Sequence, residues 1–382
     1  MKKFLLSLFT IMFALPVMAV EIYNNGDESV NFYGSIRGYV GYGLDMNNPN
    51  HGQSTSSSSM LYALQGNSRI GTDIKISNFT SKIELGFDEA TLFGGTKSLG
   101  IRHAWGAYSF GNNGKLLMGK TDTPTAMSGF SSDIYDGDSG LKGFGGTVTG
   151  QRRFQIQYTV AGLTLALVED DVAELGSNYT NFTEGGKYTP RASLAYVYKN
   201  DSLHAKIGAT YTAVNGYYTD INNQRKWTNL HAFGIVAGFK QKFLDEKFYF
   251  SLQARYGMNE ELYGEYTTRY MAAENNKTNE IGVNASINND GSFNNVHRVG
   301  ATLEFGVKAT ENFTAVLGGG YQNTLKENTA NENYESYAVF LQGAYKLNKY
   351  FSIIPQITYY NTTGSNTSQS ALIAAAQLKA SF

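Results

Sequence analysis

The stretch VGATLEFGV, from Val299 to Val307, alternates at every step between an apolar side chain and a small or polar one. Successive side chains of an extended strand point to opposite faces, so this pattern predicts a strand with one apolar and one polar face. The same alternation recurs in FYFSLQARY (Phe248–Tyr256), in RFQIQYTV (Arg153–Val160) and along Leu372–Phe382 at the C-terminus. Helical spacing is not sustained over any comparable length, and the chain is therefore predicted to be all-β.

Extending the alternation over the whole sequence predicts sixteen strands, at about 30–43, 66–77, 79–89, 99–111, 114–121, 151–160, 162–169, 191–199, 202–212, 230–241, 246–257, 296–309, 312–323, 334–347, 350–360 and 371–382. The connections alternate strictly between short turns and long polar loops, and the long ones are 44–65, 90–98, 122–150, 170–190, 213–229, 258–295, 324–333 and 361–370. An even number of antiparallel strands with this arrangement is the layout of a transmembrane β-barrel, with short periplasmic turns and long extracellular loops.

A secreted β-sandwich would also alternate, but two features of the sequence favour the barrel. The polar face carries Gly, Ser, Thr and Gln with single spaced charges, whereas a solvent-facing sheet is rich in Lys and Glu. The chain also ends on a strand, at Phe382, which leaves the last strand free to pair with the first. Closure matters because an open sheet edge in lipid leaves backbone groups without hydrogen bonds.

The composition excludes several functional classes. The 382 residues include 31 basic and 32 acidic side chains, so no excess of positive charge is available for binding nucleic acid. The absence of Cys excludes thiol catalysis and Cys-ligated zinc, and five His leave little for metal chemistry. We therefore expect no cofactor and no metal site.

The first nineteen residues have the features of a secretory signal peptide. Lys2 and Lys3 precede an apolar run from Phe4, and Val17-Met18-Ala19 supplies the small residues that a signal peptidase accepts. We expect residues 1–19 to be removed on export and residues 20–382 to form a single barrel domain. The apolar run is too short to serve as a membrane-spanning helix.

Several sequence fragments together resemble the general porins of Gram-negative outer membranes. They are NFYGSIR (Asn31–Arg37), SRIGTD (Ser68–Asp73), RHAWGAYSFG (Arg102–Gly111), LMGKTDTP (Leu117–Pro124), QRRFQIQY (Gln151–Tyr158) and the terminal Phe382. The resemblance implies a homotrimeric diffusion channel of the outer membrane whose third long loop folds into the lumen. It also implies that Phe382 is a C-terminal assembly signal, although Ala380 stands where the family commonly has an aromatic residue.

The phase of the alternation selects the residues that face the lumen. A basic residue that faced lipid at mid-depth would cost about 2–4 kcal/mol, so the basic residues of the early strands are assigned to the inner wall. They are Arg37, Arg69, Lys82, Arg102 and Arg153. Loop 122–150 is the candidate constriction loop, and by resemblance its acidic residues Asp133, Asp136 and Asp138 face this wall. The basic wall and the acidic loop would create a transverse electric field across the constriction. The spacing of the three acids does not match that of a calcium-binding loop.

Other functions remain open at this point. A substrate-specific sugar channel would need an aromatic path in the lumen, and Tyr33, Tyr39, Tyr249 and Phe340 lie on the inward phase. An adhesin or structural barrel could use the long loop 258–295. An enzyme is not expected, because His103, placed on the outward face by the alternation, has no nucleophile motif beside it.

Overall fold

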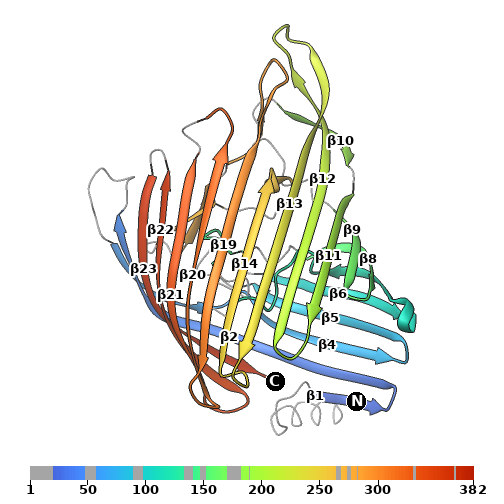
Figure 1. Cartoon of the computed structure of the whole chain (residues 1–382), viewed down its shortest axis with the longest axis vertical. Coiled ribbons are helices and arrows are strands. Elements are labelled where there is room, and N and C mark those ends of the chain that lie inside the picture. The colour runs from blue at the N-terminus through green and yellow to red at the C-terminus, as the bar shows by residue number, and fades with distance from the viewer. Residues whose placement is uncertain are drawn as a thin grey trace.

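The computed structural model describes residues 20–47, 57–88, 98–132, 141–146, 152–169, 182–188, 190–263, 268–272, 277–281, 283–329, 333–364 and 367–382. Nineteen strands of this part of the chain form one antiparallel sheet that closes on itself (Figure 1). The helices within the described residues are two short 3₁₀ segments, η2 (Gly111–Asn113) and η4 (Glu260–Tyr263). No helix within the described ranges is long and apolar enough to cross a membrane.

The closed sheet is a barrel of sixteen spanning strands, as predicted. Two spanning strands are each interrupted into two segments. The segments β3 and β4 both pair with β2. The segments β10 and β11 both pair with β12. The short strand β1 (Val20–Asn25) folds back on β2. The wall consists, in order, of β2 (Glu28–Asn47), β3 (Ser57–Leu64) with β4 (Ser68–Ile76), β5 (Phe79–Asp88), β6 (Ser98–Ser109), β7 (Lys115–Thr121), β8 (Arg153–Val160), β9 (Leu163–Val168), β10 (Thr183–Tyr188) with β11 (Arg191–Lys199), β12 (Leu203–Thr219), β13 (Arg225–Phe243), β14 (Phe248–Met258), β19 (Val296–Lys308), β20 (Phe313–Lys326), β21 (Tyr334–Lys346), β22 (Phe351–Gly364) and β23 (Thr367–Ser381).

The last strand closes the barrel on the first. β23 pairs with β2 from Ser35 opposite Ser381 to Asn47 opposite Ser370. Gly34 and Phe382 then exchange two backbone hydrogen bonds, of 2.8 and 3.0 Å. A Cβ atom on Gly34 would lie 2.3 Å from the Phe382 ring, so this glycine makes room for the terminal aromatic side chain. The sheet therefore has no open edge along this seam.

Several predicted loops are shorter than the sequence indicated. The predicted loop 44–65 is wrong, because β2 continues to Asn47 and its partner strand already begins at Ser57. The partner strand is interrupted at residues 65–67, where Gln65 N donates to Arg37 O and keeps the chain next to β2. The predicted loop 213–229 is also wrong, since β12 and β13 continue as a hairpin that projects above the rest of the barrel (Figure 1).

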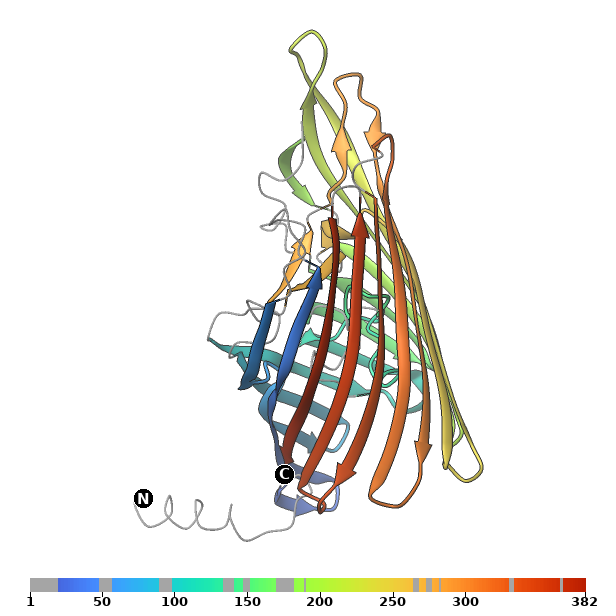
Figure 2. The same cartoon turned by 90° about the vertical axis from the view of Figure 1, so that its left-hand side faces the viewer.

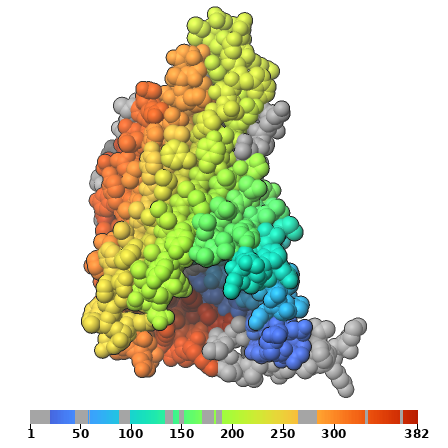
Figure 3. Space-filling model, turned by 45° about the vertical axis from the view of Figure 1, so that its right-hand side comes forward, coloured from blue at the N-terminus to red at the C-terminus, as the bar shows by residue number. Residues whose placement is uncertain are grey.

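The wall is uneven in height. β12 and β13 have 17 and 19 residues, whereas β7, β8 and β9 have 7, 8 and 6. Figure 2 shows the long strands of the C-terminal half rising well above the strands of the N-terminal half. Figure 3 shows a hollow at the lower end of the barrel, through which the inner side of the opposite wall is visible.

The two faces of the barrel have reversed polarity compared with a water-soluble protein. The outward positions carry large apolar side chains that are exposed, among them Ile207, Leu303, Leu317, Val339 and Leu341. The inward positions carry polar side chains that are buried, among them Gln155, Thr302, Gln342, Thr358 and Gln377. Exposed apolar surface of this extent marks contact with lipid or with another protein. At these positions, the alternation read from the sequence assigns the strand faces as the structure has them.

Candidate pore constriction

The loop after β7 enters the barrel and follows its inner wall, as the predicted fold required. Side chains from four successive strands hold the backbone carbonyl and amide groups of residues 126–132. Lys206 of β12 and Ser251 of β14 donate to the carbonyl oxygens of Ala126 and Phe130, and Lys240 of β13 lies 3.4 Å from the carbonyl oxygen of Gly129. The Ser132 amide donates to both carboxylate oxygens of Glu304 on β19, at 3.0 and 2.9 Å.

Apolar contacts reinforce this first part of the loop. Met127 and Phe130 are buried together with Val236 of β13. The Phe130 ring stacks on His204 of β12, with 4.2 Å between ring centroids. A Cβ atom at Gly238 would lie 2.2 Å from Met127 Cε and 2.9 Å from the Phe130 ring, so the bare backbone there provides the space that both side chains occupy.

The second described part of the loop, residues 141–146, lies further round the same wall. Leu141 and Phe144 are buried in a cluster with Tyr39, Phe340 and Tyr360 of β2, β21 and β22. The Phe144 and Tyr360 rings are 4.8 Å apart. The described loop therefore lines the interior from β12 round to β22 and β2, and it leaves the inner faces of β4, β5 and β6 uncovered.

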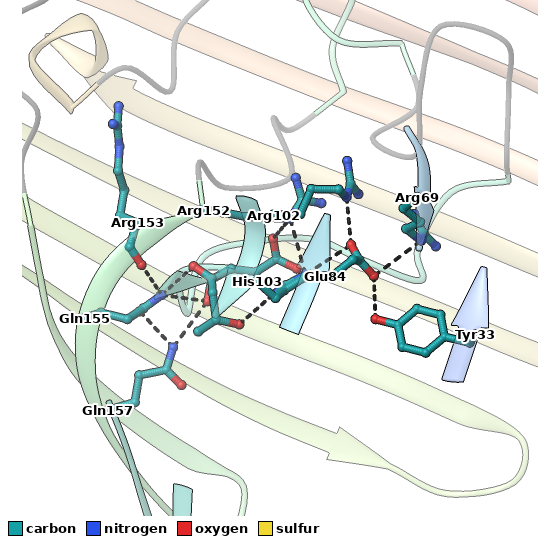
Figure 4. A network of polar contacts seen from close by, with 11 residues as sticks. Tyr33, Arg69, Glu84, Arg102, His103, Arg152, Arg153, Gln155 and Gln157 are labelled. Carbon is teal, nitrogen blue, oxygen red and sulfur yellow. Dashed lines mark hydrogen bonds and ion pairs between the residues drawn. The ribbon is translucent and has the colours of Figure 1, made fainter. Parts of the chain in front are cut away.

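The uncovered wall is organised around the Glu84 carboxylate of β5, which is 4% exposed (Figure 4). Its Oε1 accepts a hydrogen bond from Arg102 Nε of β6 at 2.7 Å. Its Oε2 accepts one from the Tyr33 hydroxyl of β2 at 2.7 Å and lies 3.5 Å from Arg69 Nε of β4. One carboxylate thus holds two arginines and a tyrosine from three other strand segments of the wall.

A β-bulge places His103 on the inner face as well. Glu84 pairs with His103 and Leu85 pairs with Ile101, so Arg102 is the extra residue on β6. Such a bulge shifts the phase of the alternation by one residue. The expectation that His103 faces outward is therefore wrong. Its Nε2 accepts a hydrogen bond from Arg152 at 3.3 Å, and its Nδ1 lies 3.1 Å from Thr121 Oγ1.

A cavity of about 350 Å³ separates this wall from the loop. The loop side contributes the small or polar residues Ser128, Gly129, Ser131 and Ser132. The remaining lining consists of four cationic side chains, two carboxylates and one histidine, namely Arg69, Lys82, Arg102, Arg152, Glu84, Asp122 and His103. Among the described lining residues, the positive charges outnumber the negative ones.

The residues proposed for the wall fall into two groups. Arg69, Lys82 and Arg102 line the cavity, and Lys82 also forms an ion pair with Asp73 at 3.2 Å. Arg37 and Arg153 lie on the inner face but away from this cavity. Arg37 Nε donates to Ser35 at 3.0 Å, and Figure 4 shows the Arg153 side chain pointing away from Glu84.

The alternation could not find two further charged residues of the cavity. Arg152 and Asp122 form an ion pair at 3.2 Å, and both lie just beyond the ends of β8 and β7, where strand periodicity gives no direction. The proposed loop acids Asp133, Asp136 and Asp138 lie outside the described residues. No cluster of potential metal ligands occurs among the residues whose positions are described.

No protein-family model matches the chain, and no curated protein matches its sequence. Solved structures do match it. The outer membrane channel DcaP of Acinetobacter baumannii has a TM-score of 0.65 at 16% identity, with 95% of this chain and 99% of that chain covered. The anion-selective porin from Comamonas acidovorans has a TM-score of 0.58 at 12% identity, covering 93% and 100%.

The trimer form of OmpT, an outer membrane protein of Vibrio cholerae, has a TM-score of 0.54 at 12% identity, covering 92% of this chain and 99% of that chain. At identities this low, the similarity establishes a shared fold. The chain thus has the β-barrel fold of outer-membrane channels.

Proposed function

We propose that the protein is a water-filled channel for the passive diffusion of ions and small hydrophilic solutes across a Gram-negative outer membrane. The main observation in support of this proposal is the charged cavity between the loop and the wall of β4–β6, inside a barrel whose outer face is apolar. Charged groups lining a narrow passage favour permeating ions of opposite sign, whereas an apolar exterior fits a lipid environment. The proposal includes export with removal of residues 1–19.

The excess of positive charge in the cavity predicts a preference for anions. Replacing Arg69 and Arg102 together by Gln should widen the passage and shift the preference toward cations. Reversal potentials of purified protein in planar bilayers under asymmetric salt measure this preference directly. Arg225→Gln on the exposed projecting hairpin is a matched control, and it should leave the reversal potential unchanged. An unchanged reversal potential in the Arg69/Arg102 double variant would contradict the proposed role of the wall.

A sugar-specific channel is less well supported. Tyr39 and Phe340 are buried beneath loop residues 141–146, and the hydroxyl groups of Tyr33 and Tyr249 point to the carboxylates Glu84 and Glu304. These four aromatic residues therefore do not form a continuous path along the passage. Flux that is linear in solute concentration would support a general channel, whereas saturable block by an oligosaccharide would support a specific one.

The proposed assembly is a homotrimer, in line with the trimeric form of the structurally similar OmpT. A trimer of independent pores should insert as one unit and close in equal conductance steps. Insertion of single independent conductances at all protein concentrations would contradict this assembly.

A further inference from the structure

The described parts of a second long connection, residues 259–263, 268–272, 277–281 and 283–295, also lie inside the barrel, although the sequence placed this connection among the external loops. The helical turn η4 directly follows β14, and all four of its residues are buried. Leu262 and Tyr263 pack with Val214 and Leu230 of the inner wall. A Cβ atom at Gly234 would lie 2.4 Å from the Tyr263 hydroxyl, so η4 lies directly against the β13 backbone.

Buried charges fix this segment to the wall. Arg298 of β19 and Glu261 of η4 form an ion pair at 2.7 Å, and their side chains are 0% and 2% exposed. Arg298 also donates to the Val283 carbonyl at 2.7 Å, while Glu261 accepts the Ala285 amide at 2.8 Å. One ion pair thus ties the beginning and the end of the connection to the same strand. A buried pair of this kind is strongly sensitive to loss of one partner.

The two ends of the connection, at Asn259 and Asn295, are held in place by contacts that do not involve the Arg298–Glu261 ion pair. Asn259 adopts a left-handed conformation, with φ of 52°, and its amide donates to the Val296 carbonyl at 2.8 Å. Asn295 bonds through both its backbone and its side-chain nitrogen to Glu327, each at 2.9 Å. The path of the chain into the barrel is therefore set at both of its ends.

The middle of the connection crosses to another part of the wall. Its strands β15 (Thr268–Ala272) and β16 (Lys277–Ile281) pair with each other, and β15 lies next to β21, β22 and β23. In the order of strands around the barrel, β21, β22 and β23 lie several strands away from β12 and β13. Figure 2 shows this part of the chain inside the ring of strands, above the level of the constriction loop. The described parts of the connection thus contact two separate stretches of the wall, at β12–β13 and at β21–β23.

We propose that the described parts of this connection, η4, β15, β16 and residues 283–295, form a second, extracellular size filter of the channel, held in place by Arg298 and Glu261. This inference rests on the proposed channel function. A solute that enters from outside passes this segment before it reaches the charged cavity, so the segment limits which solutes gain access. Its burial against the inner wall distinguishes this role from that of a surface adhesin, which needs an exposed loop.

Excision of the segment tests the proposal. Met258 pairs with His297 in the sheet, so a two-residue Asn-Gly turn can join Asn259 to Val296 in place of residues 260–295. The excised channel should conduct roughly twofold more current and admit larger sugars in liposome swelling, because cross-section limits flux. Heat-modifiable mobility in gels shows whether the barrel has folded.

A point variant keeps the test independent of the excision. The chain contains no Cys, so Ala285→Cys introduces a single thiol at a position that is 1% exposed. A membrane-impermeant thiol reagent applied from outside should not label this thiol. In the double variant that also carries Arg298→Ala, the thiol should become labelled and the size limit for permeating sugars should rise. The double change Lys242→Gln with Glu246→Gln removes an exposed ion pair at the opposite end of the barrel and should change neither readout.

The outcomes separate the two proposals. If the unmodified protein forms no conducting pore, the channel function fails. If it conducts but the folded excision variant retains its conductance and size limit, the filter is refuted while the channel stands. If Ala285→Cys is labelled in the parent channel, the segment does not stay against the wall and the filter is likewise refuted.

Discussion

Glu84 offsets part of the positive charge of the cavity wall. It contacts both Arg69 and Arg102, so it neutralises part of their charge and fixes where their guanidinium groups lie. Glu84→Gln keeps the size of the side chain but removes one negative charge from the cavity. We expect the channel to become more anion-selective, as measured by the reversal potential in a salt gradient.

The control for this prediction is Glu246→Gln. Glu246 pairs with Lys242 at 2.6 Å on an exposed turn, so the same change of charge there lies far from the cavity. It should leave selectivity unchanged, because exposed charges beyond a Debye length of about 8 Å are largely screened at physiological salt. A shift toward cations in Glu84→Gln would show that Glu84 does not offset the wall arginines.

At the residue scale, the sequence was informative wherever strand periodicity was unbroken. Arg102 lines the cavity although it is the extra residue of the β6 bulge, whereas Arg69 and Lys82 could be assigned to the inner face because each lies on a regular stretch of strand. His103 could not, because a bulge depends on the register between two strands, and that register is not visible in either strand alone. The contact of Glu84 with Arg102 likewise depends on the register between the neighbouring strands β5 and β6.

At the element scale, the constriction loop is positioned by residues that are distant in sequence. Glu304 accepts two hydrogen bonds from the Ser132 amide, across 172 residues of chain. Glu304→Ala should remove this contact and lower the free energy of unfolding by about 1.5–3 kcal/mol, which is the usual contribution of a hydrogen bond to a charged group. We expect a noisier and larger open-channel current in single-channel recordings.

Glu335→Ala is the matched control, since Glu335 is an exposed carboxylate of β21 whose hydrogen bond to Asn323 lies outside the barrel. It should leave the current trace unchanged. If Glu304→Ala gives a current as quiet and as large as that of the parent, the Glu304 contact does not hold the loop.

The strands were predictable from their own residues, whereas loop 122–150 was placed in the lumen only by the family resemblance and the connection 259–295 was not placed there at all. A strand of the wall must alternate because its two faces meet different surroundings, so its own residues record the fold. The connection 259–295 has no such repeat, and its place inside the barrel depends on Arg298 and Glu261 meeting across the fold. The projecting parts of β12 and β13 were missed because residues 213–229 include many polar residues on both faces.

At the scale of the whole molecule, every proposal depends on the outer face of the barrel contacting lipid. Val339 of β21 lies on this face, is 52% exposed, and pairs across the sheet with Gly319 and Tyr359. Leu317 and Leu341, also exposed, continue the apolar surface around it. In water, an exposed position of this kind tolerates most substitutions within about 0.5 kcal/mol.

In a bilayer the same position should reject a charge. Val339→Arg should lower the free energy of unfolding by about 2–4 kcal/mol if the residue lies near mid-depth. Val339→Leu, which keeps the face apolar, should change it little. Urea unfolding of both variants in lipid vesicles, compared with the parent, measures the difference. Equal stability of the two variants would mean that this face meets water or a polar partner, and the inner cavity could not then be a passage across a membrane.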